Sequence, residues 1–464
     1  MCADATVTVV TSRSGAALGV GAVRTRQLPE RRADLSEQVS VKRRLPAGIV
    51  DTGFASLATF VVGLVAVVRF DDVNRGAYAL FFSAFVMGQL IANEWIFTPA
   101  EVEAVSVPEE RRLALLRPSL LLGALPCVAG AAASLIALAF TQSYAALDVV
   151  VGLAVTCAFL IVFSTMQSHV RRMFHIAARS SVAAAMSVVQ FVFVIGCVWA
   201  GTEAGVPLAW LPFGALGLAN LVSMAVGLWA ARVELGADPP LHLRFRELSN
   251  RGFWFVLNGA AAAIAGFVVA VAVSALASPE DLGFAESARV VAQPVLVFAA
   301  GLTAVLAPRA VLAGIDRDRA LSRSTSRLYL VVLLGGSALY LLAVAWDWAL
   351  NPVAPIVPSA YVVTGLVALS VVANAVAAST FLQGDEFAGA GRERFLAGIA
   401  WFSSIFAVTG GATAGVTGAF ARPIAVITGG SARFIIQAVA LRRMHDHDPG
   451  ADAFRSSADL PLNP

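Results

Sequence analysis

Apolar stretches of about the length that a helix needs to cross a bilayer recur along this chain, and they constrain its fold more than any other feature. About twelve can be counted, at residues 47–68, 76–97, 119–140, 145–166, 181–200, 208–231, 253–276, 283–306, 328–349, 359–382, 395–409 and 416–439. Backbone polar groups find no water in hydrocarbon, so such stretches must be helices or strands of a closed barrel, and their length favours helices. The sequence therefore predicts an all-α polytopic membrane protein.

The composition supports lipid as the solvent for most of the chain. Apolar residues make up 58% of the 464 residues and charged residues 14%, against about 45–50% and about 25% in soluble domains. A soluble core of this size would need more charged residues to cover it. The net charge of +3 comes almost entirely from arginines in short loops, so it does not indicate binding to nucleic acid.

The arginines also predict the orientation of the helices. Seventeen of them lie in the loops after the second, fourth, sixth, eighth and tenth stretches, whereas the loops on the other side hold only Arg69 and Arg75. Positively charged loops stay in the cytoplasm during insertion. We therefore expect twelve spans in a cytoplasmic membrane of bacterial type, with both termini cytoplasmic.

A polar segment divides the chain into two sets of six helices. We expect a disordered cytoplasmic tail at residues 1–46, a six-helix bundle at 47–232, a cytoplasmic linker at 233–251, a second six-helix bundle at 252–442 and a tail at 443–464. A weak repeat at an offset of 207 aligns Asp51 with Asn258 and Gly76 with Gly283. Repeats of six helices are related by an axis along the membrane normal, which is a transporter architecture.

Three arginines fall inside predicted helices: Arg289, Arg422 and Arg433. An ionisable side chain at mid-membrane costs on the order of 3 kcal/mol, so it usually faces protein or water. Arg422 and Arg433 are eleven residues apart and share one helix face, roughly 16 Å apart along the axis. They could line a path for an anionic group, or they could extend to the interfaces or pair with carboxylates.

Other polar residues in the helices leave two interpretations open. Glu286, Arg289 and Gln293 share one helix face, where they could form an internal ion pair or a polar stripe facing a cavity. Asp51 could carry a coupling ion or be a first-turn acid that favours the start of its helix. Asn258 belongs to a set of mid-helix amides that form interhelical hydrogen bonds by default, although some could line a substrate path.

The motif search argues against an enzyme. Three of the four cysteines lie in apolar segments and none forms a CxxC pair. The sequence contains no GxxxxGK[ST], HExxH or GxSxG pattern. We therefore predict no catalytic residues, no metal and no cofactor. His169 and His175 fall in a predicted basic loop, where a solvated face contacting lipid headgroups is the simplest interpretation.

Four stretches, in order and at consistent spacing, resemble one family: residues 51–60, the glycine-aromatic start at 75–80, the basic segment 169–179 and residues 283–294. Together they resemble the polysaccharide-biosynthesis branch of the multidrug/oligosaccharidyl-lipid/polysaccharide (MOP, MATE-like) superfamily, in its actinobacterial form. The resemblance covers about residues 47–440. It departs from the multidrug branch, which often has deep acidic cation sites, and from the lipid-linked peptidoglycan branch, which typically has fourteen helices.

The resemblance implies two six-helix bundles around a V-shaped cavity that opens alternately to each side. It implies a lipid-linked, isoprenoid-pyrophosphate sugar as substrate, with cationic cavity residues meeting the pyrophosphate; assigning this role to Arg289, Arg422 and Arg433 rests on their chemistry and on no fixed motif. Membrane lipid and glycan-assembly enzymes are the expected partners. The leading prediction is a flippase or exporter of an oligosaccharide or polysaccharide precursor. An ion-coupled multidrug or metabolite antiporter is the main alternative, and a sugar-lipid-transferring membrane enzyme or a structural scaffold is a weaker one.

Overall fold

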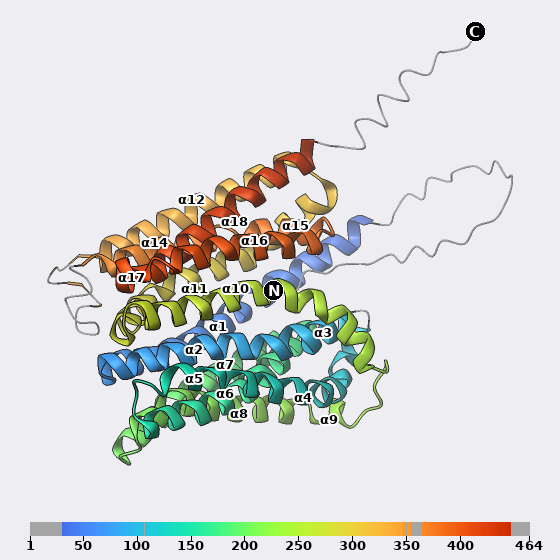
Figure 1. The fold of residues 1–464 in the computed structure, drawn as a ribbon. Helices are drawn as coiled ribbons and strands as arrows, with labels where there is room; N and C mark the ends of the chain where they lie inside the picture. Colours follow the sequence, from blue (N-terminus) through green and yellow to red (C-terminus); the bar gives the residue numbers. More distant parts are fainter. Residues whose placement is uncertain are drawn as a thin grey trace, which may run out of the picture.

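The computed structural model describes residues 30–446 apart from 106, 347, 349, 352 and 354–363. Across this part of the chain the secondary structure is helical, with no strand, and twelve helical segments are long and apolar enough to cross a membrane. The predictions of an all-α polytopic fold and of twelve spans are therefore confirmed. Figure 1 shows the helices running side by side along one direction.

The first six spans form one half of the molecule. They are α1 (Glu30–Arg69); α2 (Asp72–Ala92) continued by the π-helix η1 (Asn93–Phe97) and α3 (Thr98–Val105); η2 (Glu109–Leu115) with α4 (Leu116–Ser134) and α5 (Ile136–Thr141); α6 (Leu147–Ile176); α7 (Ser180–Glu203); and η3 (Leu208–Trp210) with α8 (Leu211–Ala230). The short helix α9 (Arg232–Leu235) follows.

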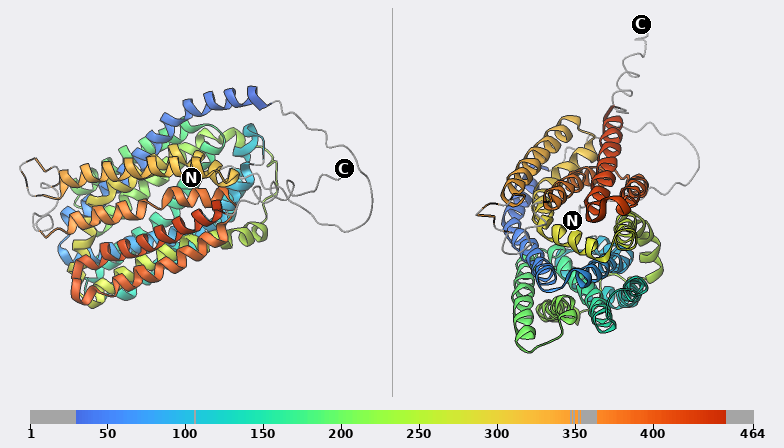
Figure 2. Two further views of the ribbon diagram at one scale, coloured as in Figure 1. Left: turned by 90° about the horizontal axis from the view of Figure 1, so that it is seen from above. Right: turned by 60° about the vertical axis from the view of Figure 1, so that its left-hand side comes forward.

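The last six spans form the other half. They are α10 (Phe245–Leu276); α11 (Pro279–Asp316); α12 (Arg319–Val344); α14 (Leu366–Ala378) with α15 (Phe381–Gly389); α16 (Glu393–Gly411); and α17 (Ala414–Thr417) with η4 (Gly418–Phe420) and α18 (Ala421–Asp446). Figures 1 and 2 show this half stacked on the first, with α1 of the first half and α10 and α11 of the second lying where the halves meet.

The two ends of the bundle can be told apart by the chain. We call the end at which α1 begins and α18 finishes the inner end, and the end that carries α5 and α17 the outer end (Figure 1). The start of α1 and the finish of α18 share one end, as an even number of spans requires. The arginine pattern predicts that the inner end is cytoplasmic.

Several helices extend beyond the predicted apolar stretches. The first helix begins at Glu30, so the tail expected to be disordered at residues 1–46 overlaps α1, and residues 1–29 lie outside the described part. The helix α6 continues to Ile176, so the residues assigned to a basic loop after Met166 are helical. The length of an apolar stretch predicts only the part of a helix that lies in hydrocarbon. The helix can extend beyond it into water, because each further turn still forms its own backbone hydrogen bonds.

The halves meet most closely where α2 crosses α11. A Cβ atom on Gly76 would overlap the carbonyl oxygen of Pro279, and one on Gly283 would lie 2.6 Å from the carbonyl oxygen of Asp72. Both contacts join residues related by the same offset of 207, so each half presents the same patch to the other, as two-fold related surfaces do. Small residues at this crossing let the two backbones approach.

The start of each crossing helix is fixed by a side-chain cap. Asp71 accepts a hydrogen bond from the backbone N–H of Asn74 at 2.8 Å, and Ser278 accepts one from the backbone N–H of Asp281 at 3.0 Å. Such caps satisfy the free N–H groups of the first turn. The equivalent caps begin α2 and α11 at the same level, at the outer end.

At the inner end the halves are joined by η1 and the start of α10. The indole N–H of Trp95 donates a hydrogen bond to Ser249 Oγ at 2.7 Å. The backbone carbonyl of Trp95 lies against Gly252, where any Cβ atom would clash. The halves are thus in contact near both ends, and a cavity lies between these contacts.

Candidate functional site

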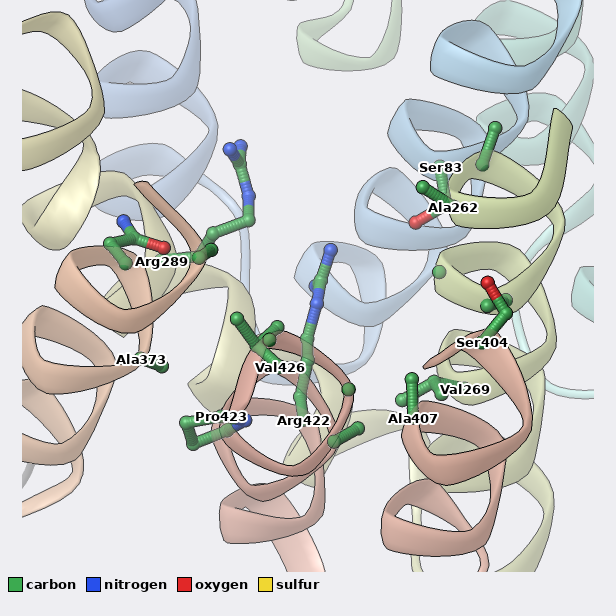
Figure 3. Close-up of a pocket in the computed structure, with 18 of the residues that line it drawn as sticks. Ser83, Ala262, Val269, Arg289, Ala373, Ser404, Ala407, Arg422, Pro423 and Val426 are labelled. Carbon is green, nitrogen blue, oxygen red and sulfur yellow. The ribbon is translucent and has the colours of Figure 1, made fainter. Parts of the chain in front are cut away.

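A cavity of about 510 Å³ opens among α2, α10, α11, α14, α16 and α18. Most of its wall is built from small and apolar residues, such as Ala262, Val269 and Ala373 (Figure 3). The polar side chains in this wall are those of Ser83, Arg289, Ser370, Asn374, Thr380, Ser403, Ser404, Arg422 and Arg433. The cavity is therefore apolar overall and carries its charge on three arginines.

Two of these arginines share one buried carboxylate. Glu286, on α11, is fully buried. It accepts hydrogen bonds at 2.9 and 2.6 Å from Nε and Nη2 of Arg289, one turn further along the same helix. It also accepts one at 2.8 Å from Nη1 of Arg422 on α18. Of the two interpretations of Glu286 and Arg289, the internal ion pair is present, and Arg422 extends it across two helices.

This cluster is cationic and faces the cavity. One carboxylate between two guanidinium groups leaves a net charge of +1, because arginine stays protonated in proteins. Figure 3 shows the side chains of Arg289 and Arg422 projecting from α11 and α18 into the same space. The Arg289 guanidinium also lies 4.2 Å from the ring centroid of Phe82 on α2, in the other half. Such cation–π contacts favour a fixed orientation of the cation.

The third arginine, Arg433, lies eleven residues after Arg422 on α18. Arg433 lines the same cavity as Arg422, as the eleven-residue spacing predicts for one helix face. Its Nε atom is buried and has no hydrogen-bond partner within the described chain, so this N–H donor is unsatisfied there. Nearby, Asn374 donates a hydrogen bond at 2.9 Å to the carbonyl of Ala292, which fixes α14 against α11.

Two other predicted site residues lie elsewhere. Gln293 is half-buried on α11 and Asn258 is half-buried on α10, and neither lines the cavity. The Oδ1 atom of Asn258 is buried without a hydrogen-bond partner. The polar stripe predicted from residues 286, 289 and 293 therefore reaches the cavity through Arg289 alone.

Asp51 belongs to a separate polar cluster, in the first half. It is 5% exposed and accepts hydrogen bonds from His175 Nε2 at 2.9 Å and Ser187 Oγ at 2.5 Å. Arg171 Nη1 lies 3.6 Å from its Oδ1. The alternative role as a first-turn acid is wrong, because α1 begins at Glu30. Asp51 instead connects α1 to α6 and α7.

A second buried cluster was missed by the sequence analysis. His169, fully buried on α6, donates from Nδ1 to Glu101 Oε1 at 2.8 Å and lies 2.7 Å by Nε2 from Ser119 Oγ. Arg172 pairs with the same carboxylate at 3.1 Å, and Phe97 stacks on the imidazole at 4.3 Å. The expectation that His169 contacts lipid headgroups is therefore wrong, since α6 carries it into the core.

Ser119, His169 and Glu101 are hydrogen-bonded in the same order as the residues of a nucleophilic triad. Their burial argues against catalysis. The exposed fractions of the three residues are 1%, 0% and 1%, so no substrate atom can reach the hydroxyl group. Among the residues that the structure describes, no group of three or more His, Cys, Asp or Glu is placed to hold a metal ion. The cluster joins α3, α4 and α6.

Comparison with known proteins identifies the fold. No protein-family model and no curated protein matches the sequence. Among solved structures, an inward-facing multidrug-resistance MATE family transporter of the MOP superfamily is 13% identical, with a TM-score of 0.67 over 86% of this chain and 96% of that one. An outward-facing MATE family transporter is 12% identical, with a TM-score of 0.63 over 88% and 97%.

A third similar structure differs in its pocket. It is a MOP superfamily transporter from Pyrococcus furiosus, described as having a binding pocket of reverse polarity that suggests a different function. It is 14% identical, with a TM-score of 0.55 over 87% of this chain and 96% of that one. At such identities the likeness concerns the fold: this chain is a polytopic membrane protein with a MATE-like fold of two six-helix halves.

Proposed function

We propose that this protein is an alternating-access transporter that flips or exports an amphiphilic anion: a lipid-linked oligosaccharide or polysaccharide precursor carried on isoprenoid pyrophosphate. The observation that carries the proposal is the charge of the cavity wall. Three arginines and one carboxylate give a net charge of +2 in an otherwise apolar enclosure. A cationic drug would be repelled there, whereas a pyrophosphate supplies the complementary charge.

The arginines keep enough free donors for such a ligand. Each guanidinium has five N–H groups in a planar fork. Glu286 takes two from Arg289 and one from Arg422, so the remaining groups can bind phosphate oxygens. Glu286 then acts as the residue that orients both forks. Arginine pairs with phosphate in a bidentate way, which makes it suited to this role.

The apolar wall fits the remainder of the substrate. A volume of about 510 Å³ lies within the range of about 300–1,000 Å³ typical of small-molecule sites, which is enough for a pyrophosphate and the first sugar. The isoprenoid chain would stay in lipid. The comparison structures support the transport cycle, since one fold is seen in inward-facing and outward-facing forms. The Pyrococcus furiosus structure, described as having a binding pocket of reverse polarity, supports the idea that this fold can carry pockets of different charge.

The proposal is tested by removing two cavity cations. We expect Arg422→Ala with Arg433→Ala to insert and fold but to lose flipping of a fluorescent isoprenyl-pyrophosphate sugar, measured in proteoliposomes by dithionite quenching. Loss of two charge-assisted contacts at about 1.5–3 kcal/mol each predicts a rate lowered about 100-fold or more. Arg394→Ala is the matched control, because Arg394 is exposed and lies 5.0 Å from the Trp254 ring, outside the cavity. Full activity of the double variant would remove the cavity role.

A second candidate is an ion-coupled antiporter for drugs or metabolites. The observation that favours it is the contact of Asp51 with His175 at 2.9 Å, since both side chains can exchange protons. In that case substrate added to reconstituted vesicles should release protons, and Asp51→Asn should abolish the release. If wild-type vesicles release no protons while they flip the sugar lipid, the antiporter is excluded.

A further inference from the structure

A groove of about 580 Å³ lies on the lipid-facing side of α12, close to its inner end. It is lined by Ala320, Arg323, Ser324, Arg327, Leu328 and Val331. All six are exposed and recur at the spacing of one helix face, whereas α12 packs into the bundle through Thr325, Tyr329 and Leu333. Only 22% of the most apolar part of this span is buried, so the groove is open to lipid.

The two arginines of the groove have no partner within the described chain. Neither Arg323 nor Arg327 forms a hydrogen bond or an ion pair there. Three other arginines towards this end of the molecule pair with carboxylates: Arg172 with Glu101, Arg179 with Glu234 and Arg319 with Asp446. Residues four apart on a helix are neighbours, so Arg323 and Arg327 present two unmatched cations side by side.

The acidic groups at the start of α12 do not supply the missing charge. Asp318 caps the helix and accepts hydrogen bonds from the backbone N–H groups of Ala320 and Leu321 at 2.8 and 3.0 Å. Asp446 pairs with Arg319 at 2.5 Å. Ser324 donates its hydroxyl to a backbone carbonyl at 3.0 Å, which leaves the guanidinium groups as the free donors of the groove.

The groove is also held in a fixed position. The side chain of His445, at the end of α18, donates to the carbonyl of Arg317 at 3.0 Å and contacts Glu386 on α15 at 2.6 Å. The His445 and Glu386 side chains are only 3% and 1% exposed. These contacts tie the turn between α11 and α12 to α18 and α15, directly before the first turn of α12.

Below the cations the groove turns apolar. Leu328 and Val331 are 48% and 65% exposed; Leu328 lies one turn beyond Ser324 and Val331 one turn beyond Arg327, further into the membrane. Arginine near a helix end places its charge at headgroup level, and the cytoplasmic leaflet carries anionic lipids. Along α12 the exposed face changes from cationic to apolar, and a phospholipid changes in the matching order, from its phosphate to its acyl chain.

We propose that this groove is a binding site for one anionic phospholipid of the inner-end leaflet, with its phosphate between Arg323 and Arg327 and an acyl chain along Leu328 and Val331. The site lies on the outside of the bundle and is separate from the cavity that the transport proposal uses. Its existence therefore does not depend on what the cavity carries.

The test measures lipid retained by the purified full-length protein in detergent. Native mass spectrometry counts bound lipid as dioleoylphosphatidylglycerol or dioleoylphosphatidylcholine is titrated. We expect one tightly bound phosphatidylglycerol that phosphatidylcholine does not replace. Arg323→Ala with Arg327→Ala should weaken it roughly 30-fold, since each arginine near an anionic surface contributes about a factor of five.

The matched control removes two other exposed arginines, by Arg111→Ala with Arg117→Ala, which lower the net charge equally but lie six residues apart in the first half. This control should retain the lipid. Equal losses in both double variants, equal binding of phosphatidylcholine, or full displacement of the lipid by 10 mM inorganic phosphate would each overturn the proposal. An unshifted unfolding temperature confirms that the groove variant is folded, because both arginines are exposed.

Discussion

Replacing Glu286 by glutamine should destabilise the protein more than replacing its partner Arg422 by glutamine. Glu286→Gln keeps the shape of the side chain but leaves Arg289 and Arg422 as two neighbouring cations without a carboxylate. Their side chains are only 23% and 14% exposed. Removing one partner of a buried ion pair costs about 3–5 kcal/mol, and water in the cavity lowers that figure, so we expect a loss of about 3 kcal/mol.

The comparison with Arg422→Gln makes this reasoning specific. That variant leaves Glu286 with the two hydrogen bonds from Arg289, so the remaining pair is neutral and fully bonded. Its cost is one charge-assisted hydrogen bond, at about 1.5–3 kcal/mol. Glu286→Gln should therefore be the less stable of the two by about 1 kcal/mol, although both remove a single charge.

The assay is equilibrium unfolding of the purified protein in mixed micelles, with and without inorganic pyrophosphate. A ligand at one hundred times its Kd stabilises the folded state by about 2.7 kcal/mol. Pyrophosphate should stabilise Glu286→Gln more than the wild type, because the variant has one more uncompensated cation in the cavity. An Arg422→Gln variant that is the less stable of the two, or an equal gain from pyrophosphate in variant and wild type, would refute the electrostatic account.

Three further tests concern packing outside the cavity. Gly76→Ala should lower the free energy of unfolding by about 1–3 kcal/mol through overlap with the opposing backbone, whereas Gly53→Ala, with nothing within 4 Å, should raise it by about 0.5–1 kcal/mol. Trp95→Phe should lower the free energy of unfolding by about 1 kcal/mol. In a double-mutant cycle, Trp95→Phe should lower it no further when Ser249 is already replaced by alanine. His169→Ala should cost about 3 kcal/mol in thermal or chemical unfolding, because it leaves a buried carboxylate with one fewer partner.

The sequence predicts the spans well because hydrocarbon imposes one rule along the whole chain. Apolar length and the arginine bias gave the number of helices, and helical periodicity gave the pair Glu286–Arg289 and the shared face of Arg422 and Arg433. Contacts between helices follow a different rule. The bond between Glu286 and Arg422 joins residues 136 positions apart, and only the packing of α11 against α18 brings them together.

The buried histidine cluster was missed for a related reason. His169 and Glu101 lie beyond the apolar stretches that end at residues 166 and 97, so hydropathy alone placed them in water. In the structure the helices continue past these boundaries, and His169 and Glu101 pair with each other inside the bundle. The signal that could have found them is helical periodicity continued past the apolar boundary: His169, Arg172 and His175 follow one another at spacings of three.

The two halves share a backbone plan but differ in charge, and this difference bears on how the proposed cycle could run. The offset of 207 that relates Gly76 to Gly283 also relates Phe82 to Arg289. The helix α8 follows a three-residue 3₁₀ turn and has Pro212 at its second position, where α18, after an equivalent turn, has Arg422. The cations of the cavity thus belong to the second half alone.

In the proposed cycle the two halves rock against each other as rigid bodies. Glu286, Arg289 and Arg422 would then move together, and no buried ion pair would have to break when the cavity opens to either side. Of the contacts that this cluster makes, the one from the Arg289 guanidinium to the Phe82 ring, at 4.2 Å, crosses to the other half. Such a contact contributes about 0.5–2 kcal/mol, so its loss or gain can bias the two conformations without disrupting the anion site.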